Sequence, residues 1–162
     1  MKRIPAVLAL ALTLSGPAAA DTLAQQVQTE ASRLLTQVKA AEAAARARPS
    51  AAAPSLAPEL ASDLQRFGLA ASRLSGEIDK SGGPTDLRCI FRGMAEETGK
   101  QLQAATAAKT AAEQSIALSH LTHMLSDAIL IAPAVGGGPA QTKAAVNATS
   151  TAAKQCPVER NF

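Results

Sequence analysis

Apolar residues recur at helical spacing through much of this 162-residue chain, and the clearest pattern lies between residues 56 and 78. Successive apolar positions there are three or four residues apart, which places their side chains on one face of an α-helix. These positions are Leu56, Leu60, Leu64, Phe67, Ala71, Leu74 and Ile78. Such a face must be buried against another apolar surface, so the pattern favours a fold of packed amphipathic helices.

The composition agrees with an all-α fold. Aromatic residues make up only 2% of the chain, with no Trp or Tyr, and alanine is abundant. Alanine favours helix, whereas the aromatic and β-branched residues that favour strands are scarce. The length suits one ordinary domain, which we expect to occupy residues 21–162.

Helix-breaking residues divide the first half of the chain into two predicted helices. The first helix is expected over 21–48, with an apolar stripe that starts at Leu23 and Val27. Three prolines and two serines in 49–58 predict a linker. The second helix is expected from Pro58 to about Lys80, and the sequence Ser-Gly-Gly-Pro then ends it with a glycine cap and a proline.

The segment from Asp86 to Ile131 has two interpretations. It contains no strong helix breaker, so a single long helix is one of them. A turn near 107–109 is the other, because Thr110 and Glu113 fit the capping box that begins a helix. The turn also divides the chain into four helices of similar length, as an antiparallel four-helix bundle requires. We therefore predict that bundle.

Residues 115–133 form the densest apolar run outside the N-terminus and contain both histidines. One helical stripe of this run contains Leu118, Leu121, Leu125 and Ile129, and a second side contains Ile116, Met124 and Ile131. A helix that is apolar nearly all round is expected to be covered by neighbours. If nothing covers the second side, Ile116, Met124 and Ile131 around the two histidines are instead expected to form a binding surface.

The first twenty residues have the pattern of a cleaved signal peptide. Lys2 and Arg3 precede a short apolar run over 4–14, and Ala18-Ala19-Ala20 gives the small residues of a cleavage site before Asp21. The alternative is an uncleaved anchor, but the apolar run is too short to span a bilayer stably. We expect a periplasmic or secreted protein with no transmembrane anchor after cleavage.

Net charge gives no indication of a nucleic-acid partner. The whole chain carries 16 basic and 13 acidic residues, a formal charge of +3. Removing Lys2 and Arg3 leaves 14 basic residues, so the mature charge is +1. An electrostatic nucleic-acid surface is therefore not expected.

Two cysteines, Cys89 and Cys156, most simply form one disulfide in an exported protein. An intermolecular bridge and two free thiols are the alternatives. Residues 133–139 are expected to be a flexible linker, and 141–155 a weak fifth helix. A bridge from Cys156 to the outer face of the third helix would tether that segment to the bundle.

The strongest candidate for a binding site is the set His120, His123 and Asp127, which project from one side of a helix. Imidazole and carboxylate groups at this spacing can bind a transition metal. In an antiparallel bundle Met94 and Glu97 lie at about the height of His123 and His120, and Met124 is a further neighbour. A Met and a His that face each other across a bundle can ligate a metal or haem iron. The alternative is that the polar residues are ordinary bundle surface and the methionines fill the core.

No catalytic motif is recognisable, so we expect a protein that is not an enzyme. The first hypothesis is a binding or protein-interaction module whose partner is another envelope protein. The alternative is a metal- or haem-binding bundle that uses the His120, His123 and Asp127 face. The alanine-rich segment 21–48 also suits an oligomer interface, because small side chains let helices approach closely.

Overall fold

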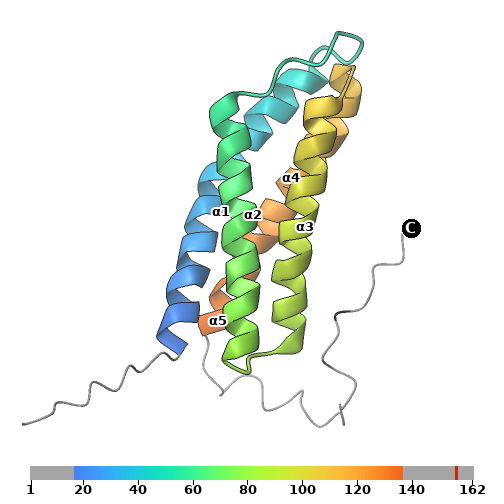
Figure 1. Cartoon of the computed structure of the whole chain (residues 1–162). Coiled ribbons are helices and arrows are strands. Elements are labelled where there is room, and N and C mark those ends of the chain that lie inside the picture. The colour runs from blue at the N-terminus through green and yellow to red at the C-terminus, as the bar shows by residue number, and fades with distance from the viewer. Residues whose placement is uncertain (1–16, 137–155, 157–162) are drawn as a thin grey trace, which may run out of the picture.

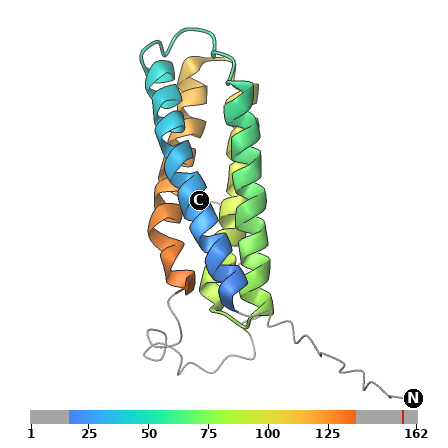
Figure 2. The same ribbon diagram turned by 90° about the vertical axis from the view of Figure 1, so that its left-hand side faces the viewer.

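The computed structural model describes residues 17–136 and Cys156, and within them the chain forms an antiparallel bundle of four long helices (Figure 1, Figure 2). The elements are α1 (Pro17–Arg46), α2 (Pro58–Lys80), α3 (Thr85–Ala107), α4 (Ala111–Ile131) and the single-turn α5 (Pro133–Gly136). Each long helix packs against the next one, and α4 packs against α1 to close the bundle. The predicted all-α four-helix bundle is confirmed.

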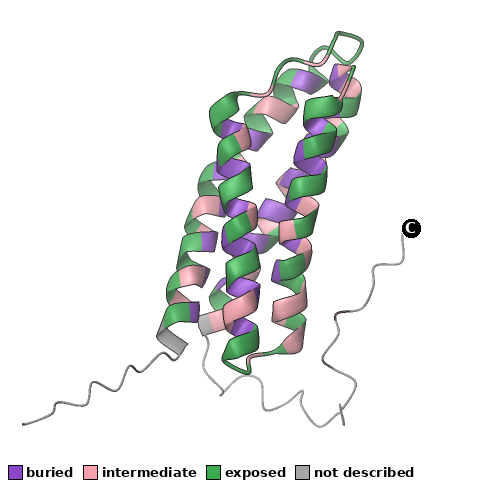
Figure 3. Cartoon of the chain, viewed as in Figure 1, coloured by how far each residue is buried: buried purple, intermediate pink, exposed green. Residues whose placement is uncertain are grey.

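The core lies along the bundle axis, where the inward stripes of the four helices meet (Figure 3). Its largest fully buried side chains include Leu34, Leu64, Phe67, Leu74, Phe91, Leu118, Leu121 and Leu125. These residues belong to the spaced apolar positions of the sequence. Ile90 shares the helical spacing of Leu87 and Met94 on α3, but it is 37% exposed.

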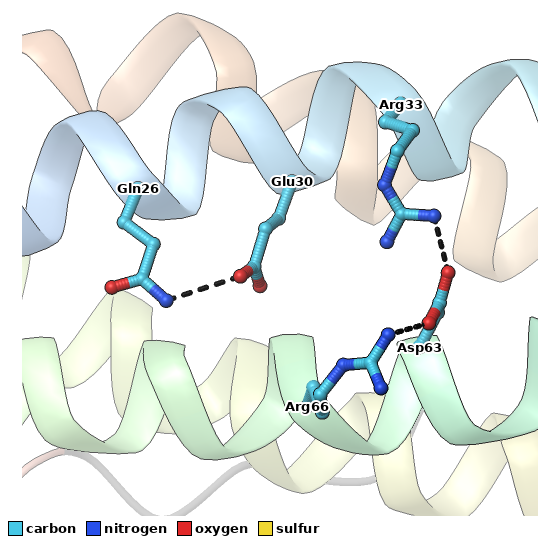
Figure 4. Close-up of polar contacts among 5 residues, drawn as sticks. All are labelled: Gln26, Glu30, Arg33, Asp63 and Arg66. Carbon is cyan, nitrogen blue, oxygen red and sulfur yellow. Dashed lines mark hydrogen bonds and ion pairs between the residues drawn. The ribbon is translucent and has the colours of Figure 1, made fainter.

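A buried carboxylate joins α1 to α2 (Figure 4). Asp63 on α2 is only 8% exposed and accepts hydrogen bonds from Arg33 on α1 and from Arg66 on its own helix. The hydrogen bond from Arg33 and the positive charges of both guanidinium groups lower the pKa of Asp63, although burial acts in the opposite direction. Asp63 is therefore held as a carboxylate between two cations.

At one end of the bundle, hydrogen bonds join the linker between α1 and α2 to the turn between α3 and α4. Ala52 pairs with Thr110 in an isolated antiparallel bridge, and the Ala53 amide donates to the Lys109 carbonyl over 3.0 Å. The side-chain amide of Gln114, which is 2% exposed, donates to the carbonyl oxygens of Pro54 and Ala105 over 2.8 and 3.1 Å. The linker between α1 and α2 is thereby fixed over the start of α4.

Residues 86–131 form two helices separated by a turn, and not the single long helix of the other interpretation. Ala108 is extended, and Thr110 begins α4 with the complete capping box. The Thr110 hydroxyl accepts from the Glu113 amide over 3.2 Å, and the Glu113 carboxylate accepts from the amides of Lys109 and Thr110. These two backbone hydrogen bonds lower the pKa of Glu113.

At the other end, a tight glycine turn reverses the chain between α2 and α3. Gly82 has a φ of +68°, a conformation that side chains strongly disfavour. The Gly83 amide donates to the Ile78 carbonyl over 2.8 Å, and a Cβ on Gly83 would lie 2.9 Å from the Ile78 Cγ2. The predicted glycine cap after Lys80 is confirmed.

Other predictions need correction. The first helix begins at Pro17 rather than at Asp21, and residues 133–136 of the expected linker form α5, which packs against α1. Neighbours do not cover α4 on all sides, because Ile116 is 61% and Leu130 is 76% exposed. A four-helix bundle leaves every helix one outward face. The predicted helix over 141–155 lies outside the described residues.

Candidate functional site

An open groove of about 630 Å³ runs between α3 and α4. From α4 it is lined by His120, His123, Met124 and Asp127, and from α3 by Cys89, Arg92, Met94, Glu96 and Glu97, among others. The antiparallel pairing of two helices of similar length brings these residues to the same height. The predicted placement of Met94 and Glu97 opposite the two histidines is confirmed in this respect.

The floor of the groove is apolar and closely packed. Met94 and Met124 are 7% and 8% exposed, so little of either side chain faces solvent. The Thr98 hydroxyl lies 2.6 Å from the Met94 carbonyl oxygen and 3.4 Å from the Met124 sulfur. Both methionines therefore serve as core residues, and the Met124 sulfur already has a hydrogen-bond donor beside it.

The α3 rim of the groove carries charges that are paired along the helix. Arg92 lies 3.5 Å from Glu96, and Glu97 lies 3.6 Å from Lys100 and accepts a 2.6 Å hydrogen bond from Gln101. Such exposed pairs contribute little to stability, so this rim is available to other polar groups. The sequence had not indicated that Arg92 and Glu96 would share a groove with the histidines.

The predicted disulfide is present, since Cys89 and Cys156 are bonded with their Cα atoms 5.3 Å apart. Both cysteines are partly buried and line the groove. Cys89 is off the inner stripe of α3, as predicted, but it lies on the side of that helix that borders α4. The bridge thus places Cys156, 67 residues further along the chain, beside the histidine-bearing helix.

The structure brings the predicted metal ligands to one surface without closing them into a ligand set. His120, His123 and Asp127 all line the groove, and all three are exposed. Within residues 17–136 and Cys156, no group of three or more His, Cys, Asp or Glu side chains converges to hold a metal ion. Successive positions along one outward helix face point in parallel directions, so a further partner is needed to complete a site.

The outward face of α4 carries an exposed stripe that the sequence alone did not reveal. Five exposed residues follow one another at steps of four, three, four and three along its outward face: Ile116, His120, His123, Asp127 and Leu130. We call this set the outer stripe. It is opposite the buried face of Leu118, Leu121 and Leu125, and its α3 side borders the groove. An apolar residue stands at each end of the stripe and polar residues stand between them.

The stretch Ala111–Val135 is long and apolar enough to cross a membrane, judged by length and composition alone. Core helices of soluble proteins share this property. Here Leu118, Leu121 and Leu125 of this stretch are fully buried within the bundle. Burial in the core thus accounts for part of its apolar character, since 39% of the apolar window is buried.

Searches against protein-family models, curated proteins and solved structures gave no significant match.

Proposed function

We propose that this protein is an exported, non-enzymatic interaction module that binds another protein through the outer stripe of α4 and the adjoining groove. The observation that carries the proposal is the exposure of Ile116 and Leu130, at 61% and 76%, on either side of two exposed histidines and Asp127. Binding of a partner would remove both apolar side chains from water, which favours association, and the polar groups between them can give specificity.

Several features support export through a cleaved signal peptide. Cleavage after Ala20 removes only the first turn of α1, and the continuous core cluster begins at Ala24. Asp21 would then stand at the new helix start, where a negative charge is favourable. The Cys89–Cys156 bridge is typical of a protein from an oxidising compartment.

The export proposal is tested by intact-mass analysis of protein from the periplasm of a Gram-negative host. We expect a chain that begins at Asp21 and takes up no alkylating reagent after denaturation without reductant. A chain that retains residues 1–20, or one that alkylates two thiols, would contradict the proposal.

The interaction proposal is tested with immobilised mature protein and envelope extract. A triple variant, H120A/H123A/D127A, changes only exposed residues and should fold normally. We expect the wild type to retain a partner that this variant loses, while Leu69→Ala on α2, also an exposed position, retains it. Equal retention by wild type and triple variant would place the interaction elsewhere.

The second candidate function is binding of a transition metal or haem. It is supported by the groove, along which two histidines and Asp127 present imidazole and carboxylate groups. The purified protein would then contain metal or show a haem absorption spectrum. Absence of both, with no change in Tm on adding Zn²⁺, Cu²⁺ or haem, would exclude this candidate.

A further inference from the structure

The outer stripe of α4 has the geometry of a coiled-coil seam. Its residues alternate four and three positions apart, the repeat with which two helices pack along their length. They lie within about 80° around the helix at 100° per residue. All five residues are exposed, so the four-helix bundle itself does not use this seam.

We propose that the outer stripe packs against the same stripe of a second copy of this chain, with the two α4 helices antiparallel. This inference rests on the proposed interaction role of that surface and names its partner. A two-fold axis through His123 generates the pairing. Each copy then presents the same patch to the other, as a closed dimer requires.

The antiparallel register pairs chemically complementary side chains. Positions 116 and 130 are each seven residues from His123, so Ile116 faces Leu130 of the second copy. His120 and Asp127 lie on opposite sides of the axis at nearly equal separation, so each imidazole can donate to a carboxylate of the other chain. The two apolar contacts thus enclose two imidazole–carboxylate pairs, with the His123 side chains at the centre.

The parallel arrangement lacks this complementarity. It places every residue of the outer stripe opposite itself, so the two Asp127 carboxylates face each other. Like charges in direct contact across an interface are unfavourable. The mature net charge of +1 gives little general repulsion between copies in either arrangement. A single helix pair is a small interface, so we expect a dimer that dissociates on dilution.

Site-specific cysteines test both the contact and its direction. In mature protein with the native disulfide intact, His123→Cys should form a disulfide-linked dimer on mild oxidation, with peptide mapping identifying a 123–123 bond. Leu130→Cys alone should not link to itself, whereas mixing Ile116→Cys protein with Leu130→Cys protein should give a 116–130 link. Leu69→Cys, a comparably exposed position on α2, is the control and should form no disulfide-linked dimer.

Sedimentation equilibrium supplies the second measurement. The wild type should show a concentration-dependent dimer, and Ile116→Asp should raise its dissociation constant at least about tenfold by placing a charge opposite Leu130. Leu69→Asp should leave the dissociation constant unchanged.

Three results would each overturn the proposal. The first is a protein that is monomeric at all concentrations, and the second is a 130–130 link, which would show parallel pairing. The third is a His123→Cys variant that stays monomeric and whose introduced thiol does not react with maleimide, because its own chain covers it. A monomer that still retains an envelope partner through α4 would overturn the dimer alone and leave the proposed function intact.

Discussion

The hydroxyl of Thr98 on α3 lies 3.4 Å from the sulfur of Met124 on α4, at the floor of the groove. The same hydroxyl is 2.6 Å from the Met94 carbonyl, so the polar groups of the floor are satisfied within the protein. This relationship assigns Met124 to the core rather than to a ligand set. A substitution at Met124 can therefore distinguish the protein-interaction function from metal or haem binding.

Met124→Leu should reduce the free energy of unfolding by less than about 1.5 kcal/mol, because the volume is conserved and Thr98 keeps the carbonyl as acceptor. Partner retention should be unchanged, since the sulfur is buried below the surface that binds. Urea unfolding and the envelope pull-down check both results. Loss of a bound metal or haem in this variant, with normal unfolding, would instead favour the second candidate function.

Asp63 should make stability depend on pH in a predictable direction. Its folded pKa lies below the ordinary value of 3.8, so its contribution is fully present above 3.8 and is lost as the pH falls from there through the folded pKa. Asp63→Asn should therefore lower Tm at pH 7, and the difference from wild type should shrink as the pH falls below 3.8.

The control for this experiment is Asp79→Asn. Asp79 also pairs with an arginine, at 2.6 Å from Arg88, but its side chain is 61% exposed. Exposed ion pairs contribute little to stability, so Asp79→Asn should change Tm only slightly, both at pH 7 and at low pH. An Asp63→Asn deficit that persists unchanged at pH 2 would show that the ionised carboxylate is not what stabilises the α1–α2 contact.

Gln114→Met should destabilise the end of the bundle where the linker crosses α4. The substitution keeps the length of the side chain but removes the donor to Pro54 and Ala105, leaving two carbonyl groups without that partner. We expect a loss of about 2 kcal/mol in the free energy of unfolding. Gln103→Met, at an exposed position of α3, should be nearly neutral. Equal effects would mean that the amide contacts contribute nothing specific.

Thr110→Ala should cost about 1 kcal/mol, the usual effect of removing an N-cap side chain. Thr110→Ser keeps a hydroxyl acceptor for the Glu113 amide and should retain most of the stability. Chemical denaturation of the three proteins measures the difference. If serine and alanine proved equally destabilising, the threonine methyl group rather than the cap would be responsible.

Short-range patterns predicted the fold well, because they act within one helix or one turn. Thr110 and Glu113 are three residues apart, so their capping box could be recognised without knowing the fold. The position of Met94 across from the histidines followed from equal helix lengths. In contrast, the Arg33–Asp63 contact and the Gln114–Pro54 hydrogen bond depend on how helices rotate about their axes and on the path of a loop.

The sequence left open whether the side of α4 that carries Ile116 would be covered, and it gave no sign that Leu130 would be exposed, for a related reason. When a helix is apolar on nearly every side, its sequence does not determine which side the bundle buries. The core selected the face of Leu118, Leu121 and Leu125, and the remaining apolar residues became surface. The sequence therefore indicated that His120, His123 and Asp127 share one face of a helix, but not that exposed apolar residues would stand at both ends of that face.

Photo-cross-linking from position 123 tests most directly whether the outer stripe of α4 is a binding surface. A benzophenone amino acid replaces His123 in one exported protein and Leu69 in a control, and cells producing each protein are irradiated. We predict a discrete covalent adduct at position 123, identified by mass spectrometry as a second copy or an envelope protein, and none at position 69. No adduct at position 123, or the same adducts at both positions, would contradict it.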